Sequence, residues 1–156
     1  MIFIGIDPGL DGAIAFFDMH NGHLSVIDMP TVEIIRNKKK KREVNAQLVA
    51  NVFRCVEGDM TATLERVGAM PGQGSTSMFS FGRSTGILEG VLAGLQIPMT
   101  IVTPQAWQKG VSMRSGDDAS RQRAVELFPS YAGLFARKKD HGRADAACMA
   151  WYAATR

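Results

Sequence analysis

The sequence predicts an α/β domain in which a five-stranded mixed sheet, opening with three antiparallel strands, is flanked by helices. Three strand patterns occupy the first 29 residues, strand and helix patterns alternate after them, and the last helical segment is apolar on nearly every side. The chain has 156 residues, of which 46% are hydrophobic and 21% charged. This composition is typical of a globular protein, and the length fits a single domain over residues 1–156.

The three opening strands are predicted from runs of β-branched, aromatic and other apolar residues at 2–6, 13–18 and 23–29. Asp11-Gly12 and Asn21-Gly22 lie between these runs, and both pairs are typical of tight turns. We therefore expect an antiparallel meander.

Helices and strands alternate in the remainder. Helical spacing or capping signals predict helices over 45–56, 75–95, 104–109, 117–128 and 144–154, and β-branched runs predict strands over 61–67 and 99–102. The helix over 75–95 carries Gly82, Gly86, Gly90 and Gly94, a spacing that favours close packing against another helix or subunit. The helix over 144–154 should be buried.

Positive charge is concentrated in one segment. The formal net charge is +3, and six of the eighteen Lys and Arg residues lie in residues 36–42, so the rest of the chain is slightly acidic. We interpret this segment as a basic loop that meets a polyanion, nucleic acid in the first place, although a plain solvated loop would have the same composition.

The two cysteines and the N-terminus indicate the compartment. Cys55 and Cys148 lie in helical patterns without metal-ligand spacing, which predicts two buried free thiols. No secretion signal precedes the first strand and no apolar run is long enough to span a bilayer. We expect a cytoplasmic protein without a membrane partner.

Four acidic residues stand where catalytic groups are often found. Asp7 directly follows the first strand, Glu65 lies near the end of the fourth, Asp145 falls in the first turn of the last helix, and Asp140 precedes that helix. Each has a structural explanation of its own: Asp before Pro starts turns, a strand-end Glu is commonly solvated, an Asp near a helix start gains from the helix dipole, and Asp140 could cap the helix.

Taken together, the acids predict a metal site. If the first and fourth strands are neighbours and the last helix crosses their ends, Asp7, Glu65 and Asp145 converge. Clustered carboxylates raise one another's pKa unless a cation lies between them, and oxygen ligands favour Mg²⁺ or Mn²⁺ over Zn²⁺. Two such ions roughly 3.5 to 4 Å apart activate water and stabilise a leaving oxygen. With the basic segment, this pattern indicates metal-dependent phosphodiester hydrolysis.

Gly5-Ile6-Asp7-Pro8-Gly9, followed by Gly12-Ala13, resembles the opening motif of RuvC-type Holliday junction resolvases, in the RNase H-like superfamily. Similarity continues, in the same order, in Leu64-Glu65-Arg66-Val67, the glycine-rich helix, Thr103-Pro104 and Arg143-Ala144-Asp145-Ala146-Ala147, and so covers nearly the whole chain. Residues 69–74 followed by Ser77-Met78-Phe79 are most similar to phage and prophage members. Sugar kinases and actin relatives share a Gly-Ile-Asp-x-Gly opening, but 156 residues cannot form their two-lobed architecture.

The resemblance implies an RNase H-like fold, a homodimer joined through the long helix, and two Mg²⁺ ions per active site for which Mn²⁺ substitutes. It assigns catalytic and metal-binding roles to Asp7, Glu65 and Asp145. The family's fourth ligand lies three positions before Asp145, where this chain has Gly142. Asp140 is the favoured replacement because a carboxylate suits Mg²⁺, and His141 stays open because it would share a helix face with Asp145.

The resemblance also directs attention to side chains that would touch DNA. A base-wedging aromatic follows the fourth-strand acid in bacterial members, whereas Gly68, Ala69 and Met70 follow it here. Trp107 is interpreted as a packing residue rather than a base stacker, and at least one of Phe79 and Phe81 as core. DNA contacts are expected from Arg36, Lys38, Lys39, Lys40, Lys41, Arg42, Lys109, Arg114, Lys138, Lys139 and Arg143.

The resulting hypothesis is a Mg²⁺-dependent endonuclease that nicks four-way DNA junctions as a homodimer. Two alternatives stay open. One is an RNase H-like nuclease acting on other branched or RNA-containing substrates, and the other is a junction-binding protein that has lost catalysis along with a ligand at position 142.

Overall fold

The computed structural model describes residues 1–66, 68, 72 and 74–156 of the chain. Its central sheet has five strands in the order β3-β2-β1-β6-β7. These strands cover β1 (Ile2–Ile6), β2 (Ala13–Asp18), β3 (His23–Asp28), β6 (Met60–Glu65) and β7 (Met99–Val102). β1 pairs antiparallel with β2 and parallel with β6, so the predicted mixed sheet with three antiparallel opening strands is confirmed.

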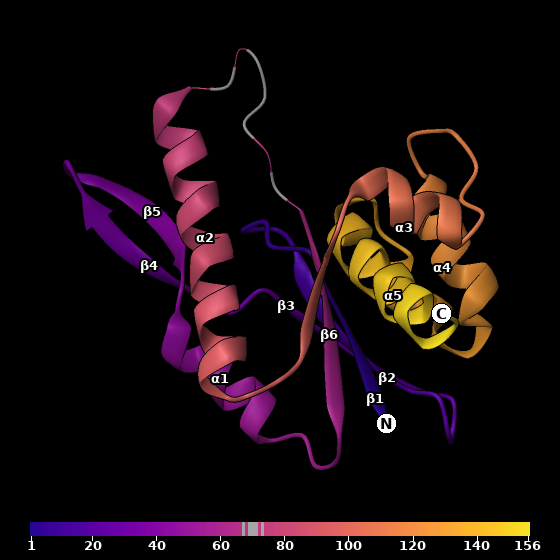
Figure 1. The fold of residues 1–156 in the computed structure, drawn as a ribbon. Helices are drawn as coiled ribbons and strands as arrows, with labels where there is room; N and C mark the ends of the chain where they lie inside the picture. Colours follow the sequence, from indigo (N-terminus) through magenta and orange to yellow (C-terminus); the bar gives the residue numbers. More distant parts are fainter. Residues whose placement is uncertain (67, 69–71, 73) are drawn as a thin grey trace.

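Helices cover both faces of the sheet (Figure 1). α1 (Ala46–Arg54) and α2 (Ser75–Gly94) lie on one face, and α5 (His141–Ala154), with α3 (Pro104–Gly110) and α4 (Ala119–Leu127), on the other. The alternation of side chains along β1 produces this division. Ile4 and Ile6 join the core under α1 and α2, whereas the intervening Gly5 faces α5. The prediction that the last helix is buried is confirmed, since most of its residues are inaccessible.

The basic segment is a β-hairpin, so its interpretation as a loop was wrong. β4 (Thr31–Arg36) and β5 (Lys39–Val44) pair antiparallel as a separate two-stranded sheet, which projects beside α2 in Figure 1. Asn37 and Lys38 form its turn with positive φ angles of 52° and 59°. The hairpin closes at its base, where the Asn45 amide donates to the Pro30 carbonyl at 3.0 Å.

Two further expectations are corrected. Cys148 is buried as predicted, but Cys55 is exposed because it follows the last turn of α1 at the molecular surface. α5 begins at His141, directly after the short 3₁₀ helix η2 (Lys138–Asp140), so Asp145 stands in its second turn and not in the first. The helix dipole therefore gives a weaker account of Asp145 than the sequence suggested.

The four glycines of α2 face away from the described residues of this chain. A Cβ added to Gly82, Gly86, Gly90 or Gly94 would meet no atom within 4 Å. None of the helices in the described ranges is long and apolar enough to cross a bilayer.

Candidate metal-dependent active site

Asp7 and Glu65 lie at the same edge of the sheet. Asp7 follows β1, Glu65 ends β6, and these two strands are parallel neighbours with Ile6 opposite Leu64. The carboxyl ends of parallel neighbours meet at one edge, as the sequence argument required. The Gly9 amide donates to Asp7 Oδ1 at 3.1 Å and fixes the Asp7 side chain against the turn that follows the strand.

Asp145 reaches this edge from α5. The helix runs against β1 so closely that only glycine fits at position 5. The charges of Asp7 and Glu65 both raise the pKa of Asp145, which places the three carboxyls within one electrostatic neighbourhood. The strand ends and the last helix therefore bring the three acids into the same region of the molecule.

All three carboxyls are costly to ionise. Burial raises the pKa of Asp145 to about 7, with the charge of Asp7 as the next cause. Burial also raises the pKa values of Asp7 and Glu65, opposed for Asp7 by the Gly9 amide and for Glu65 by a hydrogen bond from Trp107. Across the described ranges, none of the three forms an ion pair with Lys or Arg.

This donor set suits a hard divalent cation. Three desolvated oxygen donors without basic partners repel one another, and a bound cation would remove both the repulsion and the desolvation cost. As the side chains stand, no three His, Cys, Asp or Glu groups of the described residues are gathered closely enough to enclose an ion. Binding would therefore draw the carboxylates together by side-chain rotation.

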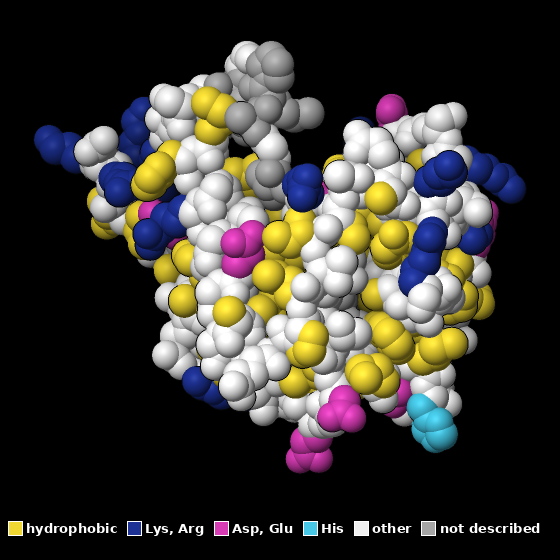
Figure 2. Space-filling view, in the orientation of Figure 1, with side chains coloured by type: hydrophobic (Ala, Val, Ile, Leu, Met, Phe, Trp, Pro, Cys, Tyr) yellow, Lys and Arg dark blue, Asp and Glu magenta, His cyan; other side chains and the backbone are white. Residues whose placement is uncertain are grey.

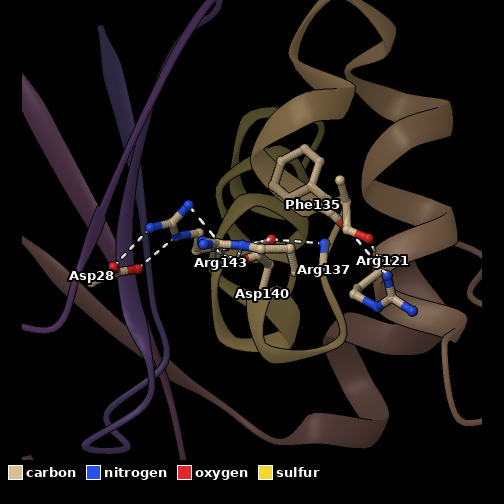
Figure 3. A network of polar contacts seen from close by, with 7 residues as sticks. Asp28, Arg121, Phe135, Arg137, Asp140 and Arg143 are labelled. Carbon is tan, nitrogen blue, oxygen red and sulfur yellow. Dashed lines mark hydrogen bonds and ion pairs between the residues drawn. The ribbon is translucent and has the colours of Figure 1, made fainter.

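Asp140 lies in a polar network with Arg137 and Arg143 (Figure 3). Its carboxylate is 2% exposed and accepts two hydrogen bonds from the Arg137 Nε and one, at 2.8 Å, from Arg137 Nη2. The hydrogen bonds from Arg137 hold the pKa of Asp140 below its usual range. Asp140 thus already has a cationic partner, which argues against our preference for it as the fourth ligand.

His141 is the other candidate for the fourth metal ligand. It lines the same cavity as Asp7, and its charge lowers the pKa values of both Asp7 and Asp145. It precedes Asp145 by four residues in α5, so the two side chains share a helix face. His141 therefore stays the alternative ligand that the sequence left open.

Gly142 stands at the position where the sequence resemblance implies a ligand, and no side chain fits there. A Cβ at this position would come within 2.4 Å of the Asp11 carbonyl oxygen and 2.8 Å of the Gly12 Cα. The turn between β1 and β2 therefore occupies the space that a ligand at position 142 would need.

Trp107 contributes more to the site than the sequence indicated. It is 1% exposed, which confirms it as a packing residue, and its indole Nε1 donates to Glu65 Oε1 at 2.9 Å. The interaction joins residues 42 positions apart, so no local sequence pattern could reveal it. Phe79 is exposed, and Phe81 is half-buried beside the cavity.

Several of the predicted DNA-contacting cations already have partners. Arg143 donates to both carboxylate oxygens of Asp28, at 2.6 and 2.7 Å, and ties the end of β3 to α5 (Figure 3). Lys40 pairs with Glu33 and Arg36 with Glu43 within the hairpin, and Arg42 pairs with Asp11. In the part of the chain described, no ion pair involves the remaining members of that set, which are Lys38, Lys39, Lys41, Lys109, Arg114, Lys138 and Lys139.

The cations gather in two regions of the surface. Figure 2 shows Lys and Arg side chains over the β4–β5 hairpin on one side and over α3 and α4 on the other. A base-wedging aromatic would be expected at residues 68–70, where Gly68 is described and Ala69 and Met70 lie outside the described residues. Most of the segment 69–74, whose sequence resembles that of phage members, also lies outside them.

Comparison with known proteins agrees with this fold. RuvC of Thermus thermophilus in complex with a Holliday junction substrate superimposes with a TM-score of 0.65 at 14% identity, covering 99% of this chain and 93% of RuvC. A second Thermus thermophilus RuvC structure gives a TM-score of 0.54 at 12% identity over 99% of this chain and 96% of that one. The chain therefore has the RuvC fold, of the RNase H-like type.

A curated relative matches by sequence as well. The chloroplastic Holliday junction resolvase MOC1 of Chlamydomonas reinhardtii is 33% identical over 86 residues, which is 54% of this chain. The match spans 10% of the length of that relative. No family model matches the chain.

Proposed function

We propose that this chain is a metal-dependent endonuclease that resolves four-way DNA junctions, each subunit of a homodimer nicking one strand. The observation that carries the proposal is the placement of Asp7, Glu65 and Asp145 in one region of a RuvC-type fold, desolvated and without an ion pair to any Lys or Arg of the described residues. The names of the similar proteins support the choice of a four-way junction as substrate.

Asp7, Glu65 and Asp145 would hold the metal, with His141 as the fourth ligand in place of Asp140. Mg²⁺, two ions per site with Mn²⁺ as a working substitute, supplies the positive charge that activates water and stabilises the leaving oxygen of a phosphodiester. Asp7 is the natural shared ligand because its charge raises the pKa values of both Glu65 and Asp145.

Hydrogen bonds restrain two of the three acids. The Gly9 amide fixes one oxygen of Asp7, and the Trp107 indole fixes one oxygen of Glu65. Burial keeps bulk water from these carboxyls, so their attraction for a bound cation would be little screened.

A two-fold axis would place a pair of such sites on opposing strands of a junction, which has the same symmetry. The open glycine face of α2 supports self-association through this helix, because nothing in the described chain packs on it. The phage or prophage origin is supported by the sequence resemblance of residues 69–79.

Cleavage of a synthetic four-way junction tests the proposal. The wild-type protein should cut opposing strands with Mg²⁺ or Mn²⁺ and not with a chelator, and Asp7→Asn should abolish cleavage while junction binding persists. An intact junction after incubation with wild type, or equal cutting by Asp7→Asn, contradicts the proposal. Rates on flap, duplex and RNA–DNA hybrid substrates separate junction resolution from a broader RNase H-like nuclease.

A junction-binding protein without catalysis is the second candidate. Two observations favour it: no three potential ligands of the described residues enclose an ion as they stand, and position 142 carries none. Tight junction binding without cleavage in Mg²⁺, Mn²⁺ and Ca²⁺ would select this candidate.

A further inference from the structure

A cavity of about 600 Å³ opens directly beside Asp7. It is lined by the turn from Gly9 to Gly12, by Lys41 and Arg42 of β5, and by the first half of α2. His141 reaches it from α5, so the cavity and the proposed metal site share two residues. Metal binding by the acids gives no role to the side chains of α2 that line this cavity.

The inward face of α2 changes character along its length. Leu88 and Leu92 are fully buried in the core between this helix and the sheet. One, two and three turns before Leu88, the helix carries Ser84, Ser80 and Ser77, and these residues line the cavity together with Thr76. These hydroxyls continue the stripe of α2 that faces the core, where apolar side chains would give the helix more buried contact. Their presence at these positions points to a ligand in the cavity.

The hairpin is anchored, so Lys41 has a defined position beside the same cavity. Arg42 donates to Asp11 Oδ1 at 3.0 Å and also to the Leu10 carbonyl, which ties β5 to the turn that follows Asp7. Glu43 lies 3.7 Å from Arg83 and ties the same strand to α2. The neighbouring cations Arg42 and Lys40 are both paired, whereas no ion pair of the described residues involves Lys41.

We propose that this cavity is a subsite for the sugar–phosphate backbone of the strand being cut, with Lys41 and the hydroxyls of Thr76, Ser77 and Ser80 holding a phosphate next to the one at Asp7. Lysine and serine or threonine hydroxyls are common donors to phosphate oxygens and fix the register of a strand without reading its sequence. This subsite rests on the proposed function and adds the positioning of the strand to it.

The charge of the cavity and its position beside Asp7 favour the sugar–phosphate backbone over the bases as its ligand. The cavity brings together Lys41, which forms no ion pair with any described residue, a set of hydroxyl donors, and two residues of the proposed metal site, Asp7 and His141. A lysine of β5 and hydroxyl donors of α2 can together bind one phosphate.

Junctions that carry a single uncharged phosphate analogue show which phosphate the subsite holds. A set of junctions, each with one methylphosphonate at a different position beside the cut, is cleaved by wild type and by variants at limiting protein concentration. For wild type, neutralising one phosphate near the cut should slow cleavage about tenfold, the range of a hydrogen bond to a charged group. In Lys41→Ala, cleavage of the unmodified junction should be slower by a similar factor, and that methylphosphonate should have no further effect.

Two matched controls separate the subsite from general charge and from folding. Lys40→Ala removes the same charge from the next residue, which pairs with Glu33, and it should keep the interference at the same phosphate. The triple variant Thr76→Val, Ser77→Ala, Ser80→Ala should lose the interference, whereas Ser75→Ala on the same helix should keep it. The salt dependence of junction binding should also fall by about one ion in Lys41→Ala.

The outcomes distinguish the subsite from the function on which it depends. If wild type cuts the junction but Lys41→Ala shows the same interference pattern, with an unchanged melting temperature, the subsite is wrong and the proposed function stands. If the triple variant keeps the interference, the hydroxyls of α2 take no part. If wild type does not cut any junction, the proposed function itself fails.

Discussion

Gly5 of β1 lies directly beneath Ala146 of α5, and a Cβ on Gly5 would stand 2.0 Å from the Ala146 carbonyl oxygen and 2.5 Å from the Ala150 amide nitrogen. Strand and helix therefore touch backbone to backbone. Asp7 is two residues beyond Gly5 and Asp145 directly precedes Ala146, so this contact sets how closely the two acids approach.

Gly5→Ala should separate the acids. The added methyl has to push α5 off the sheet, and overpacking of this kind costs about 1–3 kcal/mol or more because rigid backbone atoms are in the way. We expect a lower free energy of unfolding by urea titration and a loss of junction cleavage larger than the fraction unfolded explains. Gly90→Ala, on the open face of α2, is the matched control. The free energy of unfolding of its monomer should be at least that of the wild-type monomer. Full activity of Gly5→Ala would contradict this account.

Separate substitutions of His141 and of Asp140 should have opposite effects on cleavage and on stability. His141→Gln should reduce cleavage at least 100-fold at low Mg²⁺, because the cavity loses its fourth donor, while the melting temperature changes little. Asp140→Asn should lower the melting temperature, since Arg137 and Arg143 lose their shared carboxylate, and should retain most of the cleavage rate per folded molecule. The reverse pattern would restore Asp140 as the ligand.

Trp107→Phe should raise the Mg²⁺ requirement. The ring still fills the core, but Glu65 loses the donor that fixes its carboxylate, and removing such supporting contacts costs metal sites about 10- to 100-fold in affinity. The measurement is cleavage rate against Mg²⁺ concentration. Trp151→Phe removes the same indole far from the acids, where Trp151 packs on Phe17 and Phe128, and should leave the Mg²⁺ curve in place. Equal curves for wild type and Trp107→Phe would exclude the positioning role.

Asp145→Asn should stabilise the metal-free protein at alkaline pH. The pKa of Asp145 is raised from 3.8 to about 7, so the folded state holds this proton more tightly than the unfolded state. Stability is therefore lost as pH rises from about 4 to about 7, and the cost above pH 7 is of the order of 4 kcal/mol. Asparagine carries no such cost.

Urea titrations in EDTA check this prediction. The variant should exceed wild type in free energy of unfolding at pH 8, and the difference should shrink steadily toward pH 4.5. Saturating Mg²⁺ should stabilise wild type more than the variant. A difference that does not depend on pH would show that Asp145 is not desolvated.

The sequence predicted the sheet well because the strands carry strong local signals. Apolar alternation and turn pairs define β1 to β3, and Asp7 and Glu65 each end a strand. The hairpin was missed because four consecutive cations, Lys39 to Arg42, are poor strand formers and conceal the pairing of β4 with β5. The partners of Asp140 and Glu65 depend on side-chain direction and on contacts between distant residues, which periodicity does not report.

The closure of the β4–β5 hairpin at Pro30 and Asn45 has a consequence for how proteins of this fold can diversify. Both ends of the hairpin leave the body of the protein at one spot, so the whole arm can be shortened, exchanged or grafted onto a relative without a change in the path of the rest of the chain. The proposed contact of the hairpin with nucleic acid can thus be altered while the acids are left untouched.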